Sequence, residues 1–212
     1  MNKNPSFKYE KLLWKKNILR IAGVDEVGRG AFAGPLIAAS VILPKNFKQN
    51  GIKDSKLLTP KKREILSKYI IENSLAYSIA KVDVSSIDKF GVGNATHKAF
   101  KDCLKKVKFD FVLVDGFKIK DFDNALQKPI IHGDNISISI AAASIIAKVY
   151  RDNLMRKLHK KYPQYNFLEN KGYGTKFHRE ALRKHGLSKI HRTSFKLDKF
   201  LSKSSRVMFK PF

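Results

Sequence analysis

The chain has a single cysteine and no long apolar run, and each shortage excludes a class of protein. Cys103 alone cannot form an intramolecular disulfide or a zinc site built from several cysteines. Its helical surroundings predict a packed small hydrophobe and not a nucleophile. The longest apolar run, from Ile140 to Ala147, is much shorter than the ~20 residues that span a membrane. Residues 1–16 lack the apolar core of a signal peptide, so we expect a cytoplasmic protein without a membrane partner.

Acidic residues are also scarce. The sequence has 43 Lys and Arg against 18 Asp and Glu, which gives a net charge of +25 and a pI of about 10.1. Such an excess predicts a polyanionic partner, most simply a nucleic acid. A lysine-biased codon usage is the alternative explanation and stays open. The 43% hydrophobic content and 15 Phe indicate a folded protein.

The order of apolar segments predicts an α/β protein. We expect strands at residues 19–25, 35–43, 76–84, 109–114 and 129–133. Helical periodicity predicts helices from Pro60, behind an N-cap at Thr59, and over residues 94–107 and 137–159. This order predicts a mixed five-stranded sheet with helices on both faces.

The composition of the chain changes beyond Tyr162. Residues 163–212 are basic, rich in His and Arg, and contain only short helical patterns, such as residues 176–184. We expect a main domain over residues 1–162 and a small, mainly helical C-terminal subdomain over residues 163–212. No long apolar stripe remains once the core is assigned, so we expect a monomer with no obligate protein partner.

Four acids follow the predicted strands. Asp25 and Glu26 close the first strand, Asp115 follows residues 109–114, and Asp134 follows residues 129–133. Acids at the ends of neighbouring strands converge in space, and oxygen-only ligands favour Mg²⁺ or Mn²⁺ over zinc. The acids therefore indicate a metal-dependent phosphoryl-transfer site. The alternative is that Asp115 and Asp134 are solvated turn residues.

Two glycine-rich runs are candidate binding loops. Gly28-Arg29-Gly30 can bring bare backbone and a guanidinium to an anion. Because adjacent strand residues point to opposite faces, we also expect these glycines to end or bulge the strand at the preceding acids. Tyr173 lies between glycines in a basic run and could stack on a base or sugar. Its alternative is an ordinary loop tyrosine.

Seven motifs occur along nearly the whole chain, namely 22–30 (AGVDEVGRG), 53–56 (KDSK), 114–116 (VDG), 133–134 (GD), 139–149 (SIAAASIIAKV), 171–175 (KGYGT) and 191–195 (HRTSF). In this order they resemble the motifs of the bacterial type 2 ribonucleases H, or ribonucleases HII. The resemblance implies a ribonuclease H-like catalytic domain with a helical C-terminal extension that contributes to substrate binding.

The same resemblance implies an activity. It implies a metal-dependent endonuclease that hydrolyses the RNA strand of RNA/DNA hybrids and incises 5′ of single ribonucleotides embedded in duplex DNA. Two Mn²⁺ or Mg²⁺ ions would serve the reaction, which leaves 3′-hydroxyl and 5′-phosphate ends. Roles in ribonucleotide excision repair and DNA replication would follow.

The resemblance also implies which residues form the catalytic and substrate-binding sites. The catalytic and metal-binding acids would be Asp25, Glu26, Asp115 and Asp134. The substrate-binding residues would be Gly28, Arg29 and Gly30 at the ribose 2′-hydroxyl, Tyr173 at the RNA-to-DNA junction, and Lys56, Ser144 and Lys148 near the nucleic-acid backbone. The chain departs from the family pattern at Ala31-Phe32, where Pro-Leu is usual, and at His132, where Lys is usual. A non-catalytic nucleic-acid-binding protein and a different nuclease or transferase of the same fold are the alternatives.

Overall fold

The computed structural model describes residues 4–202. The strands are β1 (Ile21–Val27), β2 (Leu36–Ile42), β3 (Ala76–Val82), β4 (Phe111–Asp115) and β5 (Gln127–Ile130). The α-helices are α1 (Lys8–Trp14), α2 (Pro60–Asn73), α3 (Val84–Leu104), α4 (Ile138–Lys161), α5 (Phe167–Asn170) and α6 (Lys176–His185). Among residues 4–202, no helix is long and apolar enough to cross a membrane.

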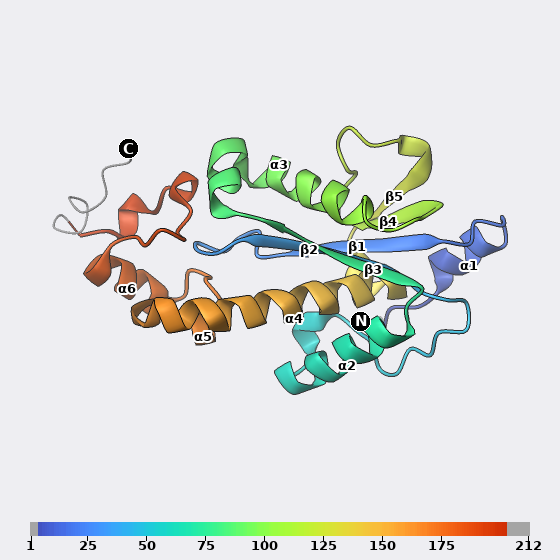
Figure 1. Cartoon of the computed structure of the whole chain (residues 1–212), viewed down its shortest axis with the longest axis horizontal. Helices are drawn as coiled ribbons and strands as arrows, with labels where there is room; N and C mark the ends of the chain where they lie inside the picture. The colour runs from blue at the N-terminus through green and yellow to red at the C-terminus, as the bar shows by residue number, and fades with distance from the viewer. Residues whose placement is uncertain (1–3, 203–212) are drawn as a thin grey trace. The chain divides into compact units, whose positions relative to one another are not determined.

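The predicted mixed five-stranded sheet is confirmed, with the strand order β3-β2-β1-β4-β5. Strand β2 runs antiparallel to β1, whereas β4 runs parallel to β1 and β5 parallel to β4. The second half of α3 (residues 96–104) covers one face of the sheet, and α2 and the first half of α4 cover the other (Figure 1). Because both faces are covered, all seven residues of β2 are buried.

Most local predictions are confirmed, and one helix is longer than expected. Helix α2 begins at Pro60 as predicted, and the Thr59 hydroxyl caps it by accepting a hydrogen bond from the Lys62 amide at 3.3 Å. Helix α3 begins at Val84, ahead of the expected residue 94. Gly91 (φ 78°, ψ 154°) interrupts its helical backbone and breaks the periodicity that marks a helix in the sequence. Cys103 is fully buried, as predicted.

The chain divides into two compact units that interleave along the sequence. The sheet unit consists of Met1–Val27, Ile37–Lys81 and Thr96–Tyr150, and the second unit of Gly28–Leu36, Val82–Ala95 and Arg151–Phe212. Helix α4 therefore begins in the sheet unit and continues into the second unit. The division of roles between residues 1–162 and 163–212 stays a prediction, and residues 203–212 lie outside the described part of the chain.

The sheet unit is closely packed where β1 crosses the start of α4. A Cβ atom placed on Gly23 would lie 2.2 Å from the backbone carbon of Ser139, a distance that real Cβ atoms do not adopt. The same helix start is held by buried Glu10, whose Oε1 accepts hydrogen bonds from the Ser137 hydroxyl at 2.6 Å and the Ser139 amide at 3.1 Å. Strand and helix therefore approach each other backbone to backbone at this point.

Gly23→Ala is expected to lower the free energy of unfolding by about 3 kcal/mol, because neither backbone can move aside cheaply. Urea unfolding followed by circular dichroism measures the effect. Gly93→Ala is the matched control, since nothing lies within 4 Å of a Cβ at that position. A Gly23→Ala variant as stable as the wild type would contradict the close packing.

Candidate active site

The sheet brings two of the predicted acids to one edge. In the parallel pair of β1 and β4, Val24 lies opposite Val114, so Asp25 and Asp115 follow at the same edge. The expected end or bulge of the first strand is wrong, because β1 stays paired with β2 as far as Val27. The extended backbone keeps its ladder hydrogen bonds there, so the side chains of Asp25 and Glu26 alternate across the strand. Asp25 is buried and Glu26 partly exposed.

The third acidic position is set by the segment that follows β5. A short 3-10 helix, η3 (Gly133–Asn135), carries Asp134, which is buried. The backbone amide of Gly133 donates to the Asp115 Oδ1 at 2.7 Å, and this bond ties η3 to the end of β4. Asn135 Nδ2 donates to Asp134 Oδ1 at 2.9 Å and fixes that carboxylate. The neighbouring His132 has a left-handed backbone (φ 54°) and is exposed.

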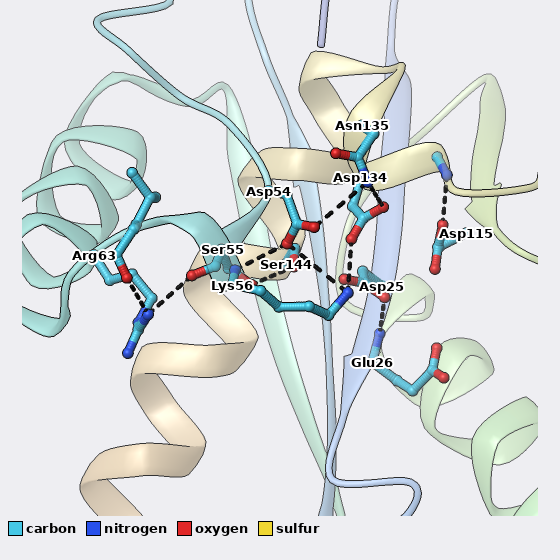
Figure 2. A network of polar contacts seen from close by, with 12 residues as sticks. Asp25, Glu26, Asp54, Ser55, Lys56, Arg63, Asp115, Asp134, Asn135 and Ser144 are labelled. Atoms are coloured by element: carbon cyan, nitrogen blue, oxygen red, sulfur yellow. Dashed lines mark hydrogen bonds and ion pairs between the residues drawn. The ribbon is translucent and has the colours of Figure 1, made fainter. Parts of the chain in front are cut away.

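A lysine lies among these acids (Figure 2). Lys56 Nζ is 3.1 Å from Asp134 Oδ2 and 3.8 Å from Asp54 Oδ1, although its side chain is 77% exposed. Asp54 also accepts from the Lys56 amide at 2.9 Å and so caps the turn that presents the lysine. On α4, the Ser144 hydroxyl is 3.0 Å from that of Ser55. Three sequence segments thus converge on the edge of the sheet.

The carboxylates influence one another strongly. Burial raises the pKa of Asp25 well above its usual range, and the charges of Glu26 and Asp115 raise it further. A hydrogen bond with Ser144 acts in the opposite direction, and the charge of Asp134 adds to the rise. The pKa of Asp115 is also raised, first by burial and then by Asp134. The charges of Glu26, Asp115 and Asp134 therefore all act on buried Asp25, and we call these four residues the acid cluster.

The chemistry of this cluster suits a hard divalent cation. Within residues 4–202, no three His, Cys, Asp or Glu side chains are grouped so that they could hold a metal ion as they lie. The acidic side chains nevertheless offer only oxygen donors, and the repulsion that raises the pKa of Asp25 would be relieved by added positive charge. The Lys56 ammonium supplies one such charge, and its exposed stem leaves it free to turn outward.

The predicted substrate loops lie in the second unit. Gly28 has a φ of +91°, and Arg29 and Gly30 are exposed. Buried Arg192 holds the turn, because its Nη1 donates to the Arg29 carbonyl at 2.9 Å and its Nε and Nη2 donate to the Gly34 carbonyl at 3.1 and 2.8 Å. Burial and, next, the charge of Arg151 lower the pKa of Arg192 to about 9.

The departure at Ala31-Phe32 places a large aromatic side chain in the packing of the second unit. Ala31 is fully buried, and the Phe32 ring stacks on Phe200 with 5.5 Å between centroids. A Cβ on Gly174 would lie 2.2 Å from the Phe32 ring, and the Phe32 amide donates to the Gly172 carbonyl at 2.8 Å. The segment after the Gly-Arg-Gly turn is thus packed against the loop that carries the tyrosine.

The tyrosine loop rests on a buried histidine pair. Tyr173 is partly exposed, and its carbonyl lies 2.9 Å from His178 Nδ1. His178 Nε2 is 3.0 Å from His191 Nε2, and the Ser188 amide donates to His191 Nδ1 at 2.8 Å. These three hydrogen bonds require His191 to carry its proton on Nε2 and His178 to carry its proton on Nδ1, with both rings neutral. Burial lowers the pKa of His178, and burial with the charge of His178 lowers that of His191 to about 3.

Several residues with clear structural roles escaped prediction. Asp54, Ser55, His191 and Arg192 lie within motifs quoted for the resemblance, but nothing in the sequence assigned them a contact. No sequence pattern pointed to Arg151 or His178. An arginine in a helical pattern is normally predicted to be exposed, whereas Arg151 is buried. The predicted Lys148 is partly buried, one helical turn beyond Ser144 on α4.

Comparison with known proteins places these features in a family. The family model of ribonuclease HII matches residues 22–198. Ribonuclease HII of Caldanaerobacter subterraneus subsp. tengcongensis is 51% identical over 189 residues, 88% of this chain and 78% of that protein. The crystal structure of ribonuclease H2 from Pyrococcus horikoshii covers 86% of this chain and 99% of its own, with a TM-score of 0.70 and 27% identity.

A structure of Bst-RNase HIII in complex with Mn²⁺ covers 89% of this chain and 71% of its own. It has a TM-score of 0.70 at 18% identity and shows the shared fold alone. The family match, in contrast, covers most of the chain and all four acids of the cluster. The chain therefore belongs to the ribonuclease HII family, whose members are endonucleases that hydrolyse the RNA of RNA/DNA hybrids.

Proposed function

We propose that this chain incises duplex DNA on the 5′ side of single embedded ribonucleotides, besides hydrolysing the RNA of hybrids, with two Mn²⁺ or Mg²⁺ ions at the acid cluster. The observation that carries the proposal is the convergence of Asp25, Asp115 and Asp134 at one edge of the sheet, where burial and mutual repulsion raise the pKa of Asp25. Mn²⁺ is the ion in the Bst-RNase HIII structure of the same fold.

The side chains of Asp25, Glu26, Asp115 and Asp134 would hold the ions. The bound ions would activate a water and stabilise the charge on the leaving 3′ oxygen. The hydrogen bonds from Gly133 and Asn135 already orient Asp115 and Asp134. Hydrolysis of this kind leaves 3′-hydroxyl and 5′-phosphate ends without a protein nucleophile.

Recognition would come from the second unit and from α4. The backbone of Gly28, Arg29 and Gly30 would contact the ribose 2′-hydroxyl, the atom that distinguishes RNA from DNA at a site. Tyr173 would stack on the sugar or base at the RNA-to-DNA junction. The net charge of +25 supports a polyanionic substrate. Lys56, Ser144 and Lys148 would lie along its backbone.

A single assay tests the proposal against its alternatives. The purified chain is incubated with Mn²⁺ or Mg²⁺ and a DNA duplex that contains one ribonucleotide, beside an RNA/DNA hybrid and an all-DNA duplex. We expect incision of the first two substrates, abolished by a chelator, with product ends that report the 5′ cut. Binding without cutting would favour a non-catalytic protein, and cutting of plain DNA a different nuclease.

Tyr173→Ala is expected to lower the preference for a single ribonucleotide over a long hybrid by about tenfold, because one stacked base contributes about 1–3 kcal/mol. The ratio of kcat/KM on the two substrates measures this preference. Tyr150→Ala is the control, since Tyr150 is an exposed tyrosine on α4. An unchanged ratio in Tyr173→Ala would show that Tyr173 does not contribute to recognition of a single ribonucleotide.

A further inference from the structure

A second buried arginine lies between the two predicted substrate loops. Arg151 is fully buried in the second unit. Its Nε donates to the Pro35 carbonyl at 3.0 Å, its Nη2 to the Ala33 carbonyl at 3.1 Å, and its Nη1 to the Lys171 carbonyl at 2.8 Å. One guanidinium thus joins the segment that follows the Gly-Arg-Gly turn to the segment that precedes Tyr173.

Arg151 also packs against both predicted recognition groups directly. Its guanidinium carbon lies 5.4 Å from the centroid of the Tyr173 ring, within the range of a cation–π contact. A Cβ atom on Gly28 would lie 2.2 Å from Arg151 Nε, so the glycine is required for the turn to rest on the arginine. The same side chain therefore supports the first residue of one loop and the aromatic ring of the other.

This arrangement is specific to arginine. Burying a charge is costly, and burial lowers the pKa of Arg151. Hydrogen bonds to three backbone carbonyls offset this cost. The three carbonyls match the donor positions of a planar guanidinium. A lysine ammonium donates from a single atom and does not reproduce the three separate nitrogens that reach these carbonyls. Arg192 differs from Arg151, because its guanidinium donates hydrogen bonds to the carbonyls of Arg29 and Gly34, on one side of the pair of loops.

We propose that Arg151 is a positioning residue that sets the distance between the Gly28–Gly30 turn and the Tyr173 ring, so that both meet the same ribonucleotide. The inference rests on the proposed function, which assigns 2′-hydroxyl contact to the turn and stacking to the ring. Arg151 would act through these two groups and not on the substrate itself. Its loss should therefore reduce recognition of a lone ribonucleotide more than cleavage of a long hybrid, where many ribonucleotides offer alternative registers.

Arg151→Lys is the main test. We expect the ratio of kcat/KM on the single-ribonucleotide duplex to that on the hybrid to fall at least tenfold. Arg156→Lys makes the same change five residues later on α4, where Arg156 is partly exposed and donates to the Asn153 side chain, and should leave the ratio unchanged. In the Tyr173→Ala background, Arg151→Lys should lower the ratio by clearly less than in the wild type, because the part of its effect that acts through the tyrosine ring is already lost.

A binding measurement separates positioning from a general loss of structure. Fluorescence anisotropy without divalent ions compares a duplex that contains one ribonucleotide with an all-DNA duplex. Arg151→Lys should remove the difference in affinity between the two, whereas a merely structural defect would weaken both equally. Arg151→Met, which removes the buried charge altogether, is the second variant if Arg151→Lys does not fold.

The outcomes are distinct. If the wild type does not incise at a single ribonucleotide, the proposed function fails before any variant is compared. If the wild type incises and a folded Arg151 variant keeps the wild-type ratio and affinity difference, the inference about Arg151 is wrong while the proposed function stands. Additive effects of Arg151→Lys and Tyr173→Ala on the ratio would also overturn it.

Discussion

Asp25→Asn is expected to lower cleavage at least 1000-fold and, at the same time, to raise the melting temperature. The loss follows because a metal site contributes several kcal/mol to the transition state, and about 1.4 kcal/mol is a factor of ten. The gain follows because Asp25 is a buried carboxyl whose pKa is raised by burial and by Glu26 and Asp115. An amide of the same shape removes that repulsion and can still accept from the Glu26 amide, now 2.7 Å from Asp25 Oδ1.

The matched control is Asp110→Asn. Asp110 directly precedes β4, at the end opposite Asp115, and its Oδ2 accepts hydrogen bonds from the Leu19 and Arg20 amides at 3.0 and 2.8 Å. The control should keep full activity and gain no stability. Rates on the hybrid and calorimetric melting curves measure both effects. An Asp25→Asn variant with wild-type rates would remove Asp25 from the active site, and one that melts lower would contradict the repulsion.

Acid is expected to destabilise the second unit through His191. Burial and the charge of His178 lower the pKa of His191 to about 3 in the folded chain, whereas an unfolded histidine titrates near about 6.5. Between these values the unfolded chain binds more protons, so stability is fully present above about pH 6.5 and falls as the pH falls. His191 alone should remove about 3 kcal/mol between about pH 7 and about pH 4.

Urea unfolding at several pH values measures this loss. His191→Gln cannot take up a proton and should show a shallower fall in unfolding free energy toward acid pH, although it starts from a lower value at pH 7 because the bond to His178 is gone. His185→Gln, at an exposed position on α6, should keep the wild-type slope. Equal slopes for the wild type and His191→Gln would show that His191 is not held neutral in the folded chain.

Much of the acid cluster could be predicted from the sequence. Asp115 closes β4, as the apolar segment before it predicted, and the parallel pairing with β1 places it near Asp25. The expected strand at residues 129–133 is shifted, because β5 ends at Ile130 and Asp134 lies on the short helix η3. The course of β1 past Asp25 could not be predicted, because strand pairing with β2 depends on the partner and overrides the low strand propensity of acids. The place of Lys56 beside Asp134 depends on a contact between residues 78 positions apart, which no local pattern encodes.

The contacts that hold the second unit together could not be predicted for a similar reason. Its predicted recognition loops gave local signals, namely the glycines around Arg29 and around Tyr173. The groups that hold these loops, Arg151, His178 and Arg192, belong to residue types that are usually exposed. Their burial follows only when several distant carbonyls and rings come together. Sequence patterns therefore identify the residues that would touch the substrate more readily than those that support them.

The interleaving of the two units has a consequence for synthesis on the ribosome. All of the sheet unit is made once Tyr150 has been added, whereas the second unit still lacks Arg151–Phe212. Its first segment, Gly28–Leu36, must wait for more than a hundred residues before its partners Arg151 and Arg192 emerge. We therefore expect the nascent chain to complete the acid-bearing sheet first and the predicted recognition loops last.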